Sequence, residues 1–198
     1  MSNDSNFFAK MFRCFGGSKK EFKNEIMEAP NELPIAYIDV ENIGVIEAEL
    51  YPHIAPNTVN NFIYLANNNF YDNLTFHRIV KNFVIQGGCP EGSGMGGPGY
   101  SIEGEFNKNN FRNDLKHTEG VLSMARSQSK NSGGSQFFII TKSAPHLNGK
   151  YAGFGKVING MDLVYKIEDL GSKGTLFVIK SIKIDIKGET YNEPIKYK

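Results

Sequence analysis

Two runs of the sequence place an arginine and two glutamines among phenylalanines. The first is Phe76-His77-Arg78-Ile79-Val80-Lys81-Asn82-Phe83-Val84-Ile85-Gln86-Gly87-Gly88, and the second is Gly134-Ser135-Gln136-Phe137-Phe138-Ile139-Ile140. Each run is typical of β-strands, in which alternate side chains point to opposite faces. One face can therefore carry a guanidinium and two amides beside aromatic rings. The chemistry that this pattern indicates is an apolar cup with a fixed cation.

Other chemistry-bearing patterns are incomplete. Gly92, Gly94 and Gly97 fit the spacing of a dinucleotide-binding loop, but Pro98-Gly99 follow where that motif needs a helix N-terminus. These glycines are interpreted as a loop beside the cup. The four histidines lack the spacing of zinc ligands. We therefore expect neither a cofactor nor a metal.

The length, charge and cysteine content indicate which classes of protein the chain can belong to. A chain of 198 residues fits one domain with an appendage, and a net charge of +1 gives no basic excess, so nucleic-acid binding is not expected. Two distant cysteines, Cys14 and Cys89, indicate free thiols in a reducing compartment. Without a run of about eighteen apolar residues or an apolar leader, a cytoplasmic location is predicted. A monomer is expected.

In residues 1–30 the apolar side chains recur at helical spacing, whereas in residues 31–198 they recur mostly at strand spacing. We therefore predict an extension, residues 1–30, followed by one domain, residues 31–198. Residues of the extension that share one helical face are Phe7, Phe8, Met11, Phe12 and Phe15. A capping pattern at Ser18-Lys19-Lys20-Glu21 predicts a second short helix, which Pro30 ends. The first helix could lie on an anionic membrane surface through residues 5–15. A partner protein, docking on the domain itself and a partly disordered tail are the alternatives.

In most of residues 31–198, apolar side chains recur at every second position, as is typical of β-strands. We predict strands near 35–41, 44–51, 74–80, 83–87, 121–126, 136–141, 154–158 and 178–187, with helices over 55–68 and 161–170. Many short strands with two helices favour a closed barrel or a sandwich.

At these residues the chain resembles the cyclophilins, the peptidyl-prolyl cis-trans isomerases. The resemblance covers most of residues 35–187 and includes Leu122-Ser123-Met124-Ala125 and Phe154-Gly155-Lys156-Val157 besides the two runs above. It implies a mainly β fold, a closed eight-stranded antiparallel barrel capped by two α-helices. It also implies rotation about X-Pro bonds in proline-containing peptides and unfolded proteins, which assists folding. The alternative is a proline-binding adaptor or chaperone with incidental isomerase activity.

The resemblance also implies roles for individual residues. Arg78 matches the catalytic arginine, and His77 beside it would orient its neighbours, because amide rotation transfers no proton. Residues implied to form the socket for the proline ring are Phe83, Val84, Phe138, Leu147 and Tyr151. Further residues implied to bind the peptide are Gln86, Gln136, Ala125, Arg126 and Ser127. His146 stands where many eukaryotic members have tryptophan, so cyclosporin is expected to bind with reduced affinity.

Overall fold

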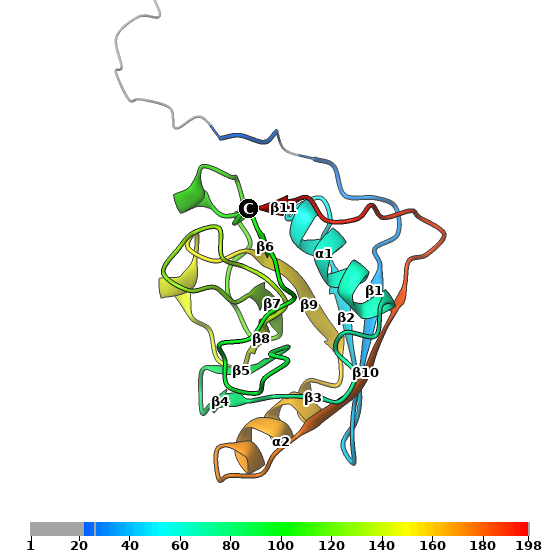
Figure 1. Cartoon of the computed structure of the whole chain (residues 1–198), viewed down its shortest axis with the longest axis vertical. Helices are drawn as coiled ribbons and strands as arrows, with labels where there is room; N and C mark the ends of the chain where they lie inside the picture. The colour runs from blue at the N-terminus through cyan, green and yellow to red at the C-terminus, as the bar shows by residue number, and fades with distance from the viewer. Residues whose placement is uncertain (1–21, 26, 198) are drawn as a thin grey trace, which may run out of the picture.

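The computed structural model describes residues 22–25 and 27–197, and in them one antiparallel sheet of nine strands dominates (Figure 1). In the order of the sheet, the strands are β3 (Leu74–Thr75), β10 (Val178–Asp185), β1 (Ile35–Val40), β2 (Gly44–Leu50), β9 (Gly153–Asn159), β7 (Val121–Met124), β8 (Phe137–Ile140), β5 (Val84–Gly87) and β4 (Arg78–Val80). A separate two-stranded sheet pairs β6 (Ser101–Ile102) with β11 (Lys196–Tyr197). The helical elements are α1 (Pro56–Asn67), α2 (Met161–Gly171) and the 3₁₀ turns η1 (Asn107–Asn109) and η2 (Pro145–Leu147).

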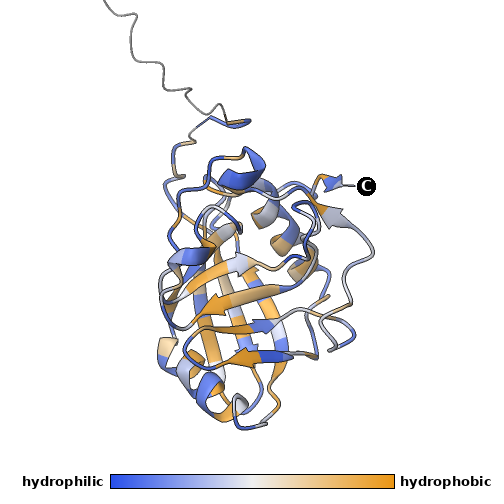
Figure 2. Cartoon of the chain, turned by 90° about the vertical axis from the view of Figure 1, so that its left-hand side faces the viewer, coloured by the Kyte–Doolittle hydropathy of each residue, from blue (hydrophilic) through white to orange (hydrophobic). Residues whose placement is uncertain are grey.

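The strands form because apolar side chains recur at every second position. In β1, Ala36, Ile38 and Val40 are buried while the residues between them are partly exposed, and β2 repeats the pattern. The hairpin between them uses Asn42 at φ 59° and Gly44 at φ 131°, conformations that asparagine and glycine tolerate best. One face of the sheet is therefore apolar, and Figure 2 shows this contrast between the strands and the hydrophilic loops.

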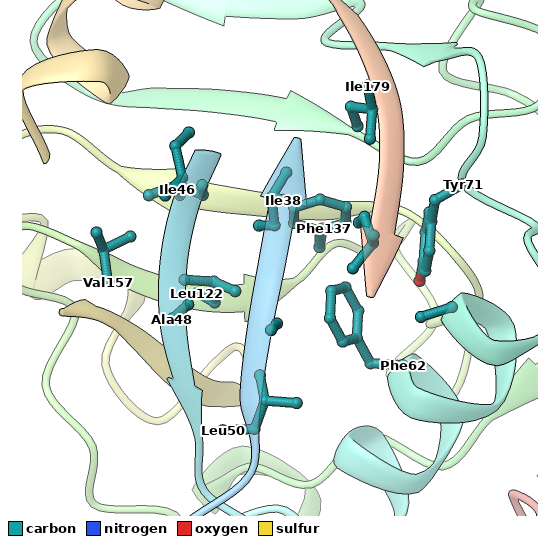
Figure 3. Close-up of a cluster of buried hydrophobic side chains, with 14 of the residues drawn as sticks. Ile38, Ile46, Ala48, Leu50, Phe62, Tyr71, Leu122, Phe137, Val157 and Ile179 are labelled. Carbon is teal, nitrogen blue, oxygen red and sulfur yellow. The ribbon is translucent and has the colours of Figure 1, made fainter. Parts of the chain in front are cut away.

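The core fills the inside of the curved sheet and centres on aromatic rings. Phe62 of α1 lies 5.3 Å from Phe137 of β8 and 5.2 Å from both Tyr71 and Phe154, measured between ring centroids (Figure 3). Tilted and edge-on contacts of this kind add to the free energy gained by burying the rings. The sheet is thereby fixed against α1, while α2 lies at the other end of the molecule (Figure 1). The predicted helices over 55–68 and 161–170 are confirmed.

The predicted closed barrel of eight strands is wrong. The sheet has nine strands, and its edges are β3 and β4, which do not pair with each other in the described structure. The predicted single strand 74–80 is broken, because β3 pairs with β10 whereas β4 pairs with β5. Between them the side chain of Phe76 is buried in the core and its N–H donates to Phe177 O at 3.0 Å. The sheet is therefore a curled half-barrel whose two edges are joined along the chain by Phe76 and His77.

The N-terminal predictions meet the structure only in part. The predicted helix carrying residues 5–15 lies outside the described residues, and the domain boundary at residue 30 stays a prediction. The second predicted helix is wrong where it can be compared, because residues 22–25 and 27–30 contain no helix. Instead, Lys23 N donates to Asn110 O at 2.7 Å and Asn24 Oδ1 accepts from Arg112 N at 2.6 Å. Hydrogen bonds to the loop that contains η1 thus replace those of a helix.

Candidate active site

Arg78 lies at the edge of the sheet in β4, directly opposite Gln86 of β5. Its Nη1 donates to Gln86 Oε1 at 3.3 Å, and Gln86 Nε2 donates to Gln136 Oε1 at 3.0 Å. Gln136 Nε2 then donates to the carbonyls of Gly94 and Gly96 at 2.9 and 2.8 Å. The two amides are thus held in one orientation, with an oxygen facing the guanidinium.

The charge of Arg78 has no counter-ion in the described part of the chain. None of the ion pairs found there includes this arginine, and the side chain is exposed. A guanidinium carries five N–H donors, and the bond to Gln86 uses one of them. The remaining donors are available to a ligand.

A hollow of about 240 Å³ lies next to Arg78 on the outer face of the sheet. The strand period explains how β5 and β8 form its floor, since Ile85 and Ile139 enter the core while Val84 and Phe138 point the other way. Tyr151 closes another side, with its ring 5.8 Å from that of Phe138. The lining residues are Arg78, Phe83, Val84, Gln86, Ala125, Arg126, Phe138, Leu147 and Tyr151. All five residues expected to form the proline socket are among them.

A second hollow, of about 390 Å³, continues from the first. The two share Gln86, Ala125 and Arg126, so together they form one groove. Besides the shared residues, its lining residues are Gly94, Met95, Gly96, Gly97, Pro98, Tyr100, Ser127, Ser132, Gly134, Ser135 and Gln136. The sequence analysis predicted Gln136 and Ser127 of this set and placed the glycine loop beside the groove. It missed Met95, Pro98, Tyr100, Ser132, Gly134 and Ser135, because a sequence pattern does not give the path of a loop.

The side chain of Arg126 supports the wall of the groove. Its guanidinium carbon lies 4.5 Å from the ring centroid of Tyr151 and 5.1 Å from that of Phe106. Its Nε and Nη2 donate to Lys150 O at 3.1 and 2.9 Å, and Nη1 donates to Ser127 O at 2.9 Å. These contacts fix Tyr151 at the mouth of the first hollow.

The two histidines predicted at the site lie at its margin. His77 is half-buried and lines neither hollow. Burial is the main reason that its pKa is lowered, so the ring is neutral at physiological pH. His146 in η2 is exposed and stacks on Phe83, with ring centroids 5.5 Å apart and planes at 26°. The peptide-binding roles of His77 and His146 stay predictions.

Helix α2 holds the turn that connects β4 to β5. Asn82 adopts φ 58° in this turn, and its N–H donates to Glu168 Oε1 at 2.8 Å. The same buried carboxylate accepts a short hydrogen bond from Thr141 Oγ1. On the surface, Lys81 pairs with Asp169 at 3.1 Å. The hairpin that carries Arg78 and Phe83 is thereby attached to a helix.

Cys89 anchors the loop that faces Gln136. Its buried Sγ accepts from Gly94 N at 3.2 Å. Burial raises the pKa of this thiol, but backbone N–H groups, those of Gly96 and Glu91 foremost, outweigh burial and lower it below its usual value. The loop is thus arranged around the sulfur, which presents the carbonyls of Gly94 and Gly96 to the site.

The described residues contain no group of three or more His, Cys, Asp or Glu side chains placed to hold a metal ion. In the same residues, no helix has the length and apolar character needed to cross a membrane.

Known proteins show which family the chain belongs to. Residues 35–187 match the family model of the cyclophilin type peptidyl-prolyl cis-trans isomerase. The chain belongs to the cyclophilin family. This cyclophilin is 52% identical over 126 residues to peptidyl-prolyl cis-trans isomerase B of Bacillus subtilis, which covers 64% of this chain and 85% of that protein. It is 49% identical over 113 residues to a peptidyl-prolyl cis-trans isomerase of Synechococcus elongatus, covering 57% and 73% of the two chains.

A solved structure agrees with this assignment. The crystal structure of a cyclophilin type isomerase of Cryptosporidium parvum, determined in the presence of the dipeptide Ala-Pro, superposes with a TM-score of 0.69. The two proteins are 35% identical, and the match covers 76% of this cyclophilin and 98% of the other chain. This cyclophilin is an enzyme, a peptidyl-prolyl cis-trans isomerase.

Proposed function

We propose that the enzyme accelerates X-Pro rotation by donating a hydrogen bond from Arg78 to the prolyl nitrogen. The barrier to rotation comes from amide resonance and is about 18–20 kcal/mol. In the planar ground state the nitrogen lone pair is delocalised and is a poor acceptor. In the twisted transition state the lone pair is localised and can accept from the guanidinium. The bond is therefore stronger in the transition state, as catalysis requires.

One hydrogen bond from Arg78 is large enough to account for the acceleration that the reaction needs. Uncatalysed isomerisation takes tens to hundreds of seconds, so a typical turnover of about 10 per second needs an acceleration of roughly a thousandfold. That factor corresponds to about 4 kcal/mol, and one preorganised donor contributes about 3–4 kcal/mol. The observation that carries the proposal is an arginine with free donors at the edge of an apolar hollow.

The hollow beside Arg78 is proposed to bind the proline ring. Its apolar walls come from Phe83, Val84, Phe138 and Leu147, and no covalent chemistry is asked of them. The Ala-Pro dipeptide with which the Cryptosporidium parvum cyclophilin was crystallised supports an X-Pro peptide as the ligand. Unfolded or extended segments containing proline are thus the proposed substrates.

The segment 125–127 is proposed to hold the residues that precede the proline. Two of its three N–H groups are already used, since Ala125 N donates to Gln136 O at 2.9 Å and Ser127 N donates to Ser132 Oγ at 3.0 Å. Strand-like pairing with the peptide therefore falls to Arg126 N–H and to the carbonyl of Ala125. Because such bonds ignore side chains, broad selectivity is expected from this segment.

The location and assembly remain proposals from the sequence. We propose a cytoplasmic monomer that does not bind nucleic acid, since the net charge is +1 and Cys89 is a free thiol. Cell fractionation tests the location, and light scattering after gel filtration tests the assembly.

The proposed role of Arg78 is tested by NMR exchange measurements on a short Ala-Pro peptide. Arg78→Ala is expected to lower kcat/KM by about a hundred- to a thousandfold, because a donor made for the transition state is lost. Arg112→Ala is the matched control, since Arg112 is also exposed but pairs with Asp114 at 2.9 Å, away from the groove. An unchanged rate in Arg78→Ala would contradict the assignment.

A further inference from the structure

The C-terminal tail lies beyond the family region but is docked on the body. The family match ends at residue 187, whereas β11 pairs with β6 in an antiparallel register that sets Lys196 opposite Ile102. Directly before β11, Asn57 Nδ2 donates to Ile195 O at 2.9 Å and Ile195 N donates to Asn57 Oδ1 at 2.7 Å. The tail is therefore fixed in one register on α1 and β6, which adjoin in Figure 1.

A chain of contacts runs from this tail to the groove. The Nζ of Lys196 lies 4.8 Å from the ring centroid of Tyr100 and 5.6 Å from that of Tyr64. The hydroxyl of Tyr100 donates to Asn61 Oδ1 at 2.8 Å, and the Nδ2 of this fully buried asparagine donates to Gly134 O at 2.7 Å. Burial, with smaller contributions from Tyr64 and Glu193, raises the pKa of Tyr100 to about 12. Tyr100 thus keeps its proton and stays a donor at physiological pH.

Two members of this chain of contacts line the second hollow. Tyr100 and Gly134 line it together with Pro98. The wall is closely packed, since a Cβ placed on Gly134 would lie 2.9 Å from Pro98 Cδ and 3.4 Å from Tyr100 O. In packing of this density a displacement of one residue moves its neighbours. A change at Lys196 is therefore expected to alter the shape of the hollow.

We propose that Lys196, carried by the tail, is a positioning residue that shapes the second hollow and so sets selectivity for the residues preceding the proline. The proposal rests on the proposed function, because it takes the groove as the peptide site. The cation over the two tyrosine rings holds Tyr100, and Tyr100 holds Gly134 through Asn61. Lys196 itself lines neither hollow, so its effect on a substrate passes through these residues.

The test compares two peptides that have alanine directly before the proline. The residue before that alanine is alanine in one peptide and phenylalanine in the other. In Lys196→Met, kcat/KM for the phenylalanine peptide is expected to fall about two- to fivefold, which corresponds to the loss of one exposed cation–π contact. The fall should come from a higher KM and not from a lower kcat. The alanine peptide should keep its rate. Lys196→Arg should restore the wild-type ratio, because arginine keeps a cation over the rings.

One further variant completes the test. Lys166→Met changes an exposed lysine of α2 at the other end of the molecule and should leave both peptides unaffected. Equal losses on both peptides, or no loss on the phenylalanine peptide, would overturn the proposal. This outcome can be distinguished from a failure of the Arg78 assignment. Arg78→Ala tests the rate on both peptides, whereas Lys196→Met tests the ratio of the two kcat/KM values, which can be measured whichever residue is catalytic.

Discussion

At the scale of single residues, His146 is expected to influence which ligands the groove binds. Its ring stacks on Phe83, the aromatic residue that lines the first hollow. An imidazole covers less of that ring than an indole, and its nitrogens are hydrated when exposed. The chain contains no tryptophan. The hollow proposed to bind the proline ring has all its expected lining residues, whereas the apolar surface next to it is smaller than a tryptophan at residue 146 would provide.

This difference predicts weak binding of cyclosporin, which is large enough to extend past the proline socket. His146→Trp is expected to tighten the drug by about tenfold or more, because the larger ring buries more apolar area. Titration calorimetry gives the affinity, and His146→Ala is the control that removes the ring without adding area. Nanomolar binding by the wild-type enzyme would contradict the prediction.

The site residues that the sequence identified are those whose neighbours in the strand are distinctive. Arg78, Gln86 and Phe138 occur in strands and Gln136 directly precedes one, so the alternation of side chains indicates which face they occupy and their convergence could be predicted. Tyr100 and Met95 follow glycines and a proline, and the path of such a loop depends on contacts made after folding. The supporting role of the Arg126 side chain could not be predicted either, because it depends on Lys150 and Tyr151.

At the scale of elements, the hairpin β4–β5 depends on a carboxylate from another element. Glu168 of α2 accepts from Asn82 N in the turn and from Thr141 Oγ1 after β8. A left-handed residue such as Asn82 is held most firmly when its N–H is bonded. The position of Arg78 is thus set partly by α2.

Glu168→Ala is expected to lower the free energy of unfolding by about 3 kcal/mol, since the buried hydroxyl of Thr141 and the partly buried N–H of Asn82 lose their acceptor. It should also lower kcat/KM by about tenfold or more, because a small shift of the hairpin misplaces Arg78. Urea unfolding and the Ala-Pro exchange assay measure the two effects.

Lys81→Ala is the matched control for Glu168→Ala, because it removes only the exposed pair with Asp169 in the same turn and should cost less than about 1 kcal/mol. If Glu168→Ala reduced stability while leaving the rate intact, α2 would not position the site.

The elements themselves were largely predictable, and the exceptions have physical causes. In the helices and most strands, the apolar residues recur at the same positions that the structure buries. The predicted strand 74–80 changes partner after Phe76, and its alternation shifts there, since the core side chains are Leu74, Phe76 and then Ile79. The sequence analysis passed over that shift because the segment is short. The predicted helix after Ser18 has a good capping pattern, but Asn24 bonds to Arg112 instead.

At the scale of the whole molecule, Glu105 couples pH to stability. Its buried carboxylate accepts from Asn57 N, Thr58 N and Thr58 Oγ1 at 2.6–2.9 Å, at the start of α1. Burial is the largest cause of its raised pKa, and the bonds from Thr58 and Asn57 oppose it. A carboxyl whose folded pKa is raised binds more protons in the folded state. Its contribution to the free energy of unfolding therefore falls as pH rises above about 4.3.

Glu105→Gln should remove this dependence. Urea unfolding of both proteins at about pH 4.5, 5.5 and 6.5 is expected to show the wild-type free energy falling with pH relative to the variant. Burial lowers the pKa of His53, His77 and His117, which acts in the opposite sense, but these residues are present in both proteins. A difference that stays constant across the three pH values would rule out Glu105 as the titrating group.

The short strands β5 and β8 have an unusual consequence for tolerance to substitution. The side chains of both strands pack in one of two apolar clusters or line the groove, and nearly all of them are buried. The long strand β10, by contrast, presents Lys180 and Lys183 to water. We expect β5 and β8 to have no neutral positions, so that sequence drift and engineered libraries alike must find their freedom in strands such as β10.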